Sequence, residues 1–109
     1  MSPLEAARAF MAATQTKDAA AAVAVCTEGV ELLLPGADAP LRGKEGIRQM
    51  IRMSPQFTFT LRKEEEHADD VRITTLTRAP GLFANYTTWR FEIEGGMVHR
   101  LRFELRGAN

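Results

Sequence analysis

The sequence has little cysteine, tryptophan or tyrosine, with one of each, and it has no excess of charge of either sign. Lysine and arginine together number 14, as do aspartate and glutamate. A single cysteine, Cys26, excludes an internal disulfide and a multi-cysteine metal site. The charge balance gives no net field that would attract nucleic acid or an anionic membrane. We therefore expect no nucleic-acid partner, no metal site and no cofactor.

Long apolar runs are also missing. Charged residues such as Glu5, Arg8 and Lys17 interrupt the alanine-rich N-terminal region, so it lacks the apolar core of a signal peptide. The run from Ala19 to Cys26 is too short to span a bilayer. A free thiol in an apolar stretch suits a reducing compartment. We expect a cytoplasmic protein without membrane attachment.

What the sequence does contain is a clear order of elements. Its 109 residues, 45% hydrophobic and 26% charged, are typical of one globular domain, which we assign to residues 1–109. Helix-type patterning fills residues 1–53, and strand-type segments then run to the C-terminus. This order favours an α+β fold, in which three helices of the N-terminal half lie against one curved, mostly antiparallel sheet.

Two helices are expected near the N-terminus. Ser2 can cap the first one, with proline at the next position and Glu5 completing a capping box. Asp18 caps a second helix that is expected to run to Cys26 and to end at Gly29. A short strand is then predicted at 30–34.

A third helix is expected after the following loop. Ile47, Met50 and Ile51 form one apolar face, and the helix ends at Ser54 because a proline comes next.

Four later segments, at 57–61, 71–75, 83–93 and 97–105, alternate apolar and polar residues as half-buried strands do. The acidic stretch 64–70 is expected to link the first two. For the last two we predict a three-residue loop, 94–96, with a bulge at left-handed Gly96. That register would pair Phe91 with His99 and turn both apolar rows toward the helices.

The pattern resembles the nuclear-transport-factor-2-like (NTF2-like) superfamily, which includes ketosteroid isomerases and SnoaL-like cyclases. The resemblance rests on the paired alanine-rich helices broken at Lys17, the strand at 30–34, the Arg-Gly-Lys-Glu-Gly-Ile block at 42–47 and the terminal Gly-Gly hairpin, and it covers nearly the whole chain. It implies a cone-like sheet wrapped around the helices, with a mouth that admits a small, often apolar, molecule.

The same resemblance implies that the proton chemistry of ketosteroid isomerases is missing. Leu34 stands where their catalytic base lies, Phe10 replaces the first-helix tyrosine, and Thr87 replaces the second acid. We therefore expect a small-molecule-binding domain that takes an apolar ligand. The candidate ligand contacts, which could equally well just fill the core, are the mostly uncharged side chains Phe10, Met50, Met53, Phe57, Phe59, Asn85, Thr87, Trp89 and Phe103.

An enzymatic alternative depends on one titratable side chain. His99 is predicted on the apolar face, where a pKa near neutrality would suit general acid or base work in an isomerase, cyclase or hydrolase. Asp38, in the loop before the third helix, is the second catalytic candidate. The other interpretation of His99 is a core histidine hydrogen-bonded to a neighbour.

A third hypothesis concerns the outer face of the sheet. Arginines dominate this face, and arginine and tyrosine favour interfaces. Members of the superfamily commonly dimerise through it, so the resemblance implies a homodimer, with a structural or interaction module as the corresponding function. The other interpretation is an exposed sheet laced by cross-strand ion pairs.

Overall fold

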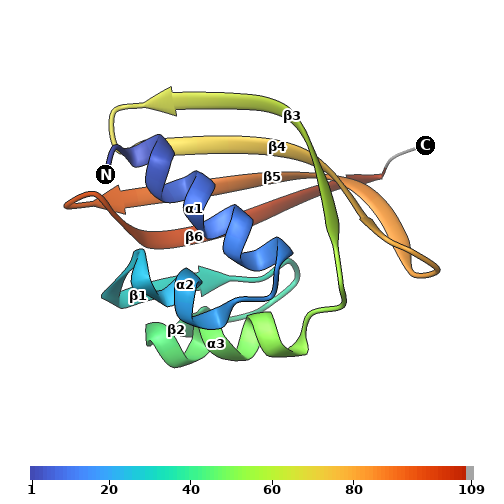
Figure 1. Cartoon of the computed structure of the whole chain (residues 1–109), viewed down its shortest axis with the longest axis horizontal. Helices are drawn as coiled ribbons and strands as arrows, with labels where there is room; N and C mark the ends of the chain where they lie inside the picture. The colour runs from blue at the N-terminus through green and yellow to red at the C-terminus, as the bar shows by residue number, and fades with distance from the viewer. Residues whose placement is uncertain (108–109) are drawn as a thin grey trace.

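A computed structural model describes residues 1–107 as one helical layer against one curved sheet (Figure 1). In chain order the elements are α1 (Pro3–Gln15), α2 (Ala19–Ala24), β1 (Cys26–Leu33), β2 (Leu41–Arg42), α3 (Gly43–Met53), β3 (Thr58–His67), β4 (Asp70–Ala79), β5 (Phe83–Glu94) and β6 (Met97–Gly107). This confirms the predicted α+β class, with three helices in the N-terminal half.

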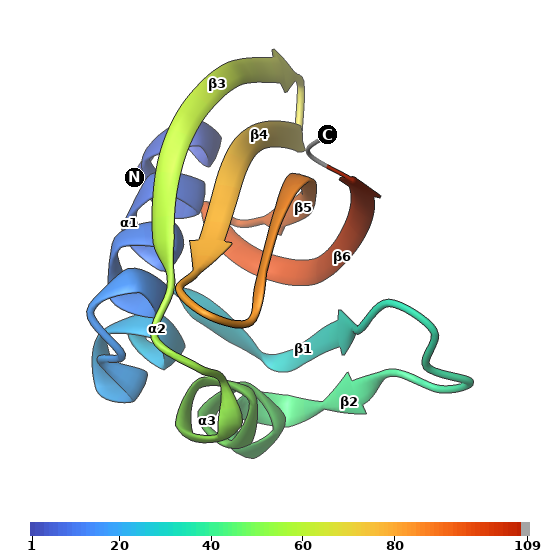
Figure 2. The same cartoon turned by 90° about the vertical axis from the view of Figure 1, so that its right-hand side faces the viewer.

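The strands form a single sheet in the order β2-β1-β6-β5-β4-β3. All neighbours are antiparallel except β1 and β6, which run parallel. Figure 2 shows that the sheet curls without closing, and that α1 lies on its concave side. The helices and the sheet therefore bury one shared core.

Local signals explain the helix starts. Ser2 accepts a hydrogen bond from the backbone nitrogen of Glu5, and the Glu5 carboxylate accepts one from the backbone nitrogen of Ser2, which completes the predicted capping box. The Asp18 carboxylate caps α2 by accepting from the backbone nitrogen of Ala21 at 3.1 Å. The third helix ends at Met53, and Ser54, the predicted end, is its C-cap residue.

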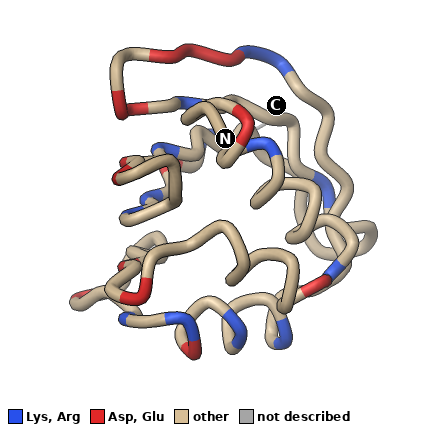
Figure 3. The backbone as a smooth tube through the Cα atoms, turned by 60° about the vertical axis from the view of Figure 1, so that its left-hand side comes forward, with Lys and Arg blue, Asp and Glu red and all other residues tan. Residues whose placement is uncertain are grey.

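The core lies between α1, α3 and the central strands. Phe10 of α1 is fully buried and meets Phe91 of β5 edge to face, with ring centroids 5.8 Å apart. Ile47 and Ile51 of α3 are also buried. None of the charged residues among 1–107 is buried. Figure 3 shows basic positions along α3 and an acidic run on β3.

The predicted end of the second helix is wrong. Helix α2 stops at Ala24, and the chain from Cys26 onward is strand β1, in which Gly29 is an internal residue. Cys26 and Leu32 are fully buried and pair with β6, so burial and strand pairing override the helical tendency of the alanine-rich sequence. The irregular stretch of β1 lies between Cys26 and Glu31.

The acidic stretch 64–70 is not a separate link, which corrects that prediction. Strand β3 continues to His67, which pairs with Asp70, so the two strands meet at a two-residue turn. The charged side chains of an edge strand can stay in contact with water while its backbone continues the hairpin, so the acidic residues do not end β3.

The predicted β5–β6 register is also wrong. The turn contains two residues, Gly95 and Gly96, both with positive φ, and Glu94 pairs with Met97. The extra residue that restores the apolar face is at His99, because Ile93 pairs with Val98 while Glu92 pairs with Arg100.

Beyond the bulge, the two apolar rows do share one face. Phe91 pairs with Leu101 and Trp89 pairs with Phe103. Val98, rather than Met97 or His99, is the fully buried residue at the start of β6.

Candidate functional site

A cavity of about 180 Å³ lies on the concave face of the sheet, under the C-terminal end of α1 and beside α3. Strands β3 to β6 form one side, and α1, α3 and the segment after β1 form the other. Most of the side chains around it are apolar. The lining consists of Thr14, Leu34, Pro35, Met50, Ser54, Phe57, Phe59, Thr77, Phe83, Asn85, Thr87, Trp89, Phe103 and Leu105.

Aromatic rings hold the sheet side of this cavity in shape. Trp89 of β5 meets Phe103 edge to face at 4.7 Å between centroids, and meets Phe59 in the same manner at 5.1 Å. Phe57 stacks on Phe59 and leans on Phe83, each at 5.8 Å. These contacts join β3, β5 and β6, and such pairs add stability beyond the area they bury. The aromatic wall is therefore preformed.

The cavity reaches the surface at its rim. Leu105 is 55% exposed and Phe83 is 40% exposed, although both line it. Trp89, by contrast, lines the cavity at its base and is only 4% exposed. A small apolar molecule would have a path from the rim to the tryptophan.

A chain of polar groups crosses the same concave face. The Trp89 indole nitrogen donates to the Thr75 hydroxyl at 3.0 Å. The hydroxyls of Thr75 and Thr77 lie 2.8 Å apart, and those of Thr77 and Thr87 lie 3.0 Å apart. Thr87 donates to the side-chain oxygen of Asn85 at 2.6 Å. Buried hydroxyls in an apolar wall are thus all hydrogen-bonded, as burial requires.

Polar groups on the helical side are satisfied within their own helices. The Thr14 hydroxyl donates to the carbonyl of Phe10, four residues earlier, at 3.0 Å. The Ser54 hydroxyl donates to the carbonyl of Met50. Neither hydroxyl has a hydrogen left for a ligand.

Most predicted ligand contacts gather around this cavity. Those that line it are Met50, Phe57, Phe59, Asn85, Thr87, Trp89 and Phe103.

Two other predicted contacts lie elsewhere. Phe10 is part of the fully buried core, and Met53 is 83% exposed. Each residue turns the helix by about 100°, so Met53 lies far round α3 from the buried face that Ile47 and Ile51 form.

Several lining residues were not predicted as ligand contacts. Thr77 and Leu105 continue inner rows that the alternation already defined, so extending those rows would have identified them. Leu34, Pro35 and Ser54 come from ends of elements, where sequence periodicity carries no signal.

The catalytic candidates do not line the cavity. His99 lies at the bulge of β6, where its Nδ1 is 2.9 Å from the Thr27 hydroxyl and its Nε2 is 3.5 Å from a Glu94 carboxylate oxygen. Asp38 is exposed in the loop before β2. The structure thus does not bring the two side chains to the aromatic wall, and their catalytic role stays a prediction.

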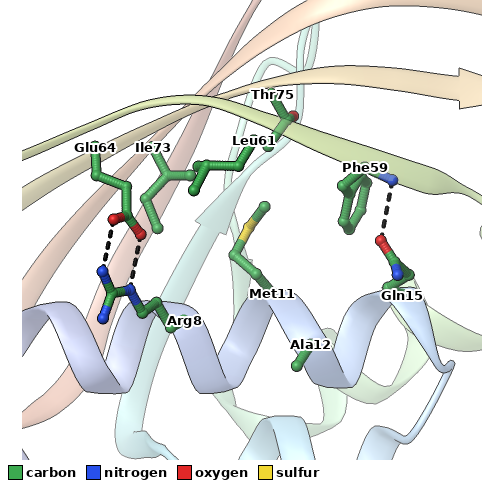
Figure 4. Close-up of a pocket in the computed structure, with 9 residues that line it drawn as sticks. All are labelled: Arg8, Met11, Ala12, Gln15, Phe59, Leu61, Glu64, Ile73 and Thr75. Carbon is green, nitrogen blue, oxygen red and sulfur yellow. Dashed lines mark hydrogen bonds and ion pairs between the residues drawn. The ribbon is translucent and has the colours of Figure 1, made fainter.

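A second hollow, of about 250 Å³, lies between α1 and strands β3 and β4 (Figure 4). Arg8 closes one end through two hydrogen bonds to Glu64, at 2.6 and 2.8 Å, and Gln15 closes the other by accepting from the backbone nitrogen of Phe59 at 3.0 Å. The hydrogen bond from Arg8 lowers the pKa of Glu64 below its usual value. The Arg8–Glu64 and Gln15–Phe59 contacts form a seam that fastens β3 to α1.

The described residues offer neither a metal centre nor a membrane span. In residues 1–107, no three histidine, cysteine, aspartate or glutamate side chains are grouped so that they could hold a metal ion. None of the helices formed by these residues has the length and apolar character needed to cross a bilayer.

The fold and cavity define a class: a cone-like α+β domain with a mostly apolar chamber between sheet and helices. A family model described as SnoaL-like domain matches residues 7–105. The chain therefore belongs to the SnoaL-like domain family, within the NTF2-like superfamily that its sequence resembles.

Solved structures of similar fold agree with this assignment. A protein from Sphaerobacter thermophilus has 20% identity, a TM-score of 0.89 and coverage of 97% of both chains. An NTF2-like protein from Cytophaga hutchinsonii has 19% identity and a TM-score of 0.82, and the match covers 97% of this chain and 91% of the other.

A computationally designed 17-OHP binder has 19% identity and a TM-score of 0.80, with 97% of this chain and 92% of the binder covered. At these identities the likeness concerns the fold. No curated protein matches the sequence.

Proposed function

We propose that this protein binds a small, largely apolar molecule in the cavity on the concave face of its sheet. The observation that carries the proposal is the aromatic wall formed by Phe57, Phe59, Trp89 and Phe103, which lines a space that reaches the surface at Leu105. Ligand sites are typically concave and mostly apolar, with a few placed polar groups. The computationally designed 17-OHP binder has a similar fold.

The size of the cavity limits the ligand. An apolar cavity of about 150 Å³ holds benzene, and this one has a volume of about 180 Å³. One ring or two small fused rings would fit inside, and a larger molecule would extend past the rim at Phe83 and Leu105. Indane, an uncharged fused bicycle, is a suitable probe.

Calorimetric titration with indane tests the proposal. We expect saturable binding to the native protein and at least tenfold weaker binding to Leu105→Trp, because the larger ring fills the rim of the cavity. Leu82→Trp is the matched control, since Leu82 is 69% exposed and does not line the cavity. If indane does not bind the native protein, or if both variants bind it equally well, the proposal is wrong.

A second proposal concerns self-association, and one row of arginines supports it. Arg72, Arg90 and Arg102 are register partners on β4, β5 and β6, so three like charges lie side by side. Such neighbours are unfavourable unless something neutralises them. Within the chain, Asp70 lies 3.3 Å from Arg72 and Glu104 lies 3.3 Å from Arg90, whereas Arg102 forms no ion pair with residues 1–107. The Nε atoms of all three are buried and have no hydrogen-bond partner among the described residues.

We propose that a second copy of the chain covers this face in a homodimer. The argument is charge complementarity at Arg102, the arginine of this row that has no carboxylate partner among residues 1–107. The next row of the sheet carries Asp70 and Glu92, which contact Arg72 and Arg100 of the same chain at 3.3 Å. A two-fold related copy would bring a carboxylate of its own outer sheet face to Arg102. We also propose a cytoplasmic location, because Cys26 is a buried free thiol and free thiols suit a reducing compartment.

Sedimentation measurements at low and high salt test the dimer. We expect a dimer that Arg102→Glu weakens, while Arg48→Glu on α3 leaves it intact. High salt should also weaken the dimer, because screening reduces attraction between partly exposed charges. A monomer at every concentration and salt would contradict the proposal.

A further inference from the structure

The polar chain on the concave face has a direction, and the direction follows from counting hydrogens. An indole N–H can only donate, so the Thr75 hydroxyl accepts from Trp89. Each threonine hydroxyl has one hydrogen to donate. Thr75 is 1% exposed, so its hydrogen needs a partner within the protein, and the Thr77 hydroxyl is 2.8 Å away.

The same count fixes the remaining links. If Thr75 donates to Thr77, then Thr77 donates to Thr87, and Thr87 donates to the side-chain oxygen of Asn85. Running the chain in the opposite direction would leave the buried Thr75 hydrogen without an acceptor, at a cost of about 1–3 kcal/mol. Trp89 therefore orients every hydroxyl and, at the far end, the amide of Asn85.

This orientation decides which atom Asn85 presents to the cavity. Its oxygen is held by Thr87, so its amino group is the end that remains. Among residues 1–107, that amino group donates no hydrogen bond, and the bond from Thr87 is the one that the Asn85 side chain makes. The hydrogens of the other polar side chains lining the cavity, including Thr14 and Ser54, are already donated. The cavity thus has an apolar wall and one side-chain donor.

We propose that the cavity selects an apolar molecule with a hydrogen-bond acceptor oxygen, such as a cyclic ketone, and that the Asn85 amino group binds that oxygen. This inference depends on the proposed ligand-binding function and adds the chemical class of the ligand. A ligand whose single polar atom is an acceptor would satisfy the donor. A pure hydrocarbon would leave the donor facing an apolar surface, which carries a desolvation cost.

A matched pair of probes separates this inference from general apolar binding. Indane and 1-indanone share a ring skeleton and differ in one carbonyl group. The quantity to measure by calorimetry is the ratio of their dissociation constants, because a variant that damages the cavity weakens both probes and leaves the ratio unchanged. A neutral hydrogen bond predicts that the native protein binds 1-indanone about five- to tenfold more tightly than indane.

Two substitutions at Asn85 remove the donor in different ways. Asn85→Asp keeps an acceptor for Thr87 but replaces the amino group with an oxygen, and Asn85→Leu replaces the amide with an apolar group of similar size. We expect both to bring the ratio close to one. Thr88→Val is the control. Thr88 lies on β5 next to Thr87, but its hydroxyl contacts that of Thr74, outside the hydrogen-bonded series from Trp89 to Asn85, and it does not line the cavity.

The outcomes are distinguishable. Equal binding of both probes by the native protein would overturn this inference while leaving the proposed function intact. A native preference for 1-indanone that survives both Asn85 substitutions would also overturn it, because the donor would then be another group. Failure of both probes to bind would overturn the proposed function together with this inference.

Discussion

At the scale of single residues, threonine supplies the polar chemistry of the cavity. Thr75, Thr77 and Thr87 are buried in a sheet that favours β-branched side chains, and their hydroxyls form one chain with Trp89. A charged group at such a position would cost far more to bury. The wall therefore stays uncharged and still orients the amide of Asn85.

Cys26 gives a prediction at this scale. Burial raises the pKa of its thiol to about 12, and the sulfur donates to the carbonyl of Ala22 at 3.3 Å. We expect an aromatic disulfide reagent at pH 8 to label the folded protein roughly a hundredfold or more slowly than the protein unfolded in guanidinium, because the thiolate is the reactive form. Fast labelling of the folded protein would show that the thiol is accessible and ionised.

Alternation along β5 was enough to predict that Asn85, Thr87 and Trp89 share the inner face. It could not predict which atom donates to which, because that depends on contacts between neighbouring strands, such as the one from Trp89 to Thr75. Sequence thus indicates the face of a side chain, and the structure supplies its partner.

At the scale of elements, the β5–β6 hairpin shows where the alternation was ambiguous. Met97 and Val98 are both apolar, so either could begin the buried row. The structure buries Val98, and the bulge at His99 then returns Leu101 to the same face. A bulge moves every later side chain, so one irregular residue placed His99 beside Thr27 instead of in the core.

Helices α1 and α3 give a paired prediction. Phe10 is fully buried against Phe91, so Phe10→Ala should lower the free energy of unfolding by about 3–5 kcal/mol. Met53 is 83% exposed, so Met53→Ala should change it by about 0.5 kcal/mol or less. Chemical denaturation measures both. Similar losses for the two variants would contradict the placement of these side chains.

The seam between α1 and β3 gives a pH-dependent prediction. Because Arg8 lowers the pKa of Glu64 in the folded protein, the ionised carboxylate stabilises the fold above the ordinary value of 4.5, and this stability is lost as the pH falls through the lowered pKa. Glu64→Gln should lower the melting temperature at pH 7 by a few degrees at most, since the pair is partly exposed.

Thermal melts across a pH series check this expectation. The difference between Glu64→Gln and the native protein should shrink as the pH drops below 4.5. Glu65→Gln on the same strand is the control, because within residues 1–107 the one ion pair of Glu65 is with nearby Lys63 on its own strand. A difference at pH 7 that persisted unchanged at acid pH would mean that Glu64 acts through packing and not through its charge.

At the scale of the whole molecule, the order of elements was sufficient to predict one helical layer against a curved sheet. The parallel pairing of β1 with β6 was not predictable, because Cys26 and Val98 are far apart in the sequence and no local pattern connects them. The cavity is likewise a product of assembly. It arises where α3, the end of α1 and the aromatic side chains of three strands fail to fill the space between them.

The central claim is that this cavity, and no other hollow of the molecule, holds a small apolar ligand. Methionine methyl groups report on it directly, because Met50 lines the cavity, Met11 lines the hollow between α1 and strands β3 and β4, and Met53 is exposed. The test is a methyl-resolved NMR titration of the protein, labelled at its methionine methyls, with indane. The account predicts that the Met50 signal shifts and saturates while those of Met11 and Met53 stay in place. A shift confined to Met11, or no shift of Met50 at saturating indane, would contradict it.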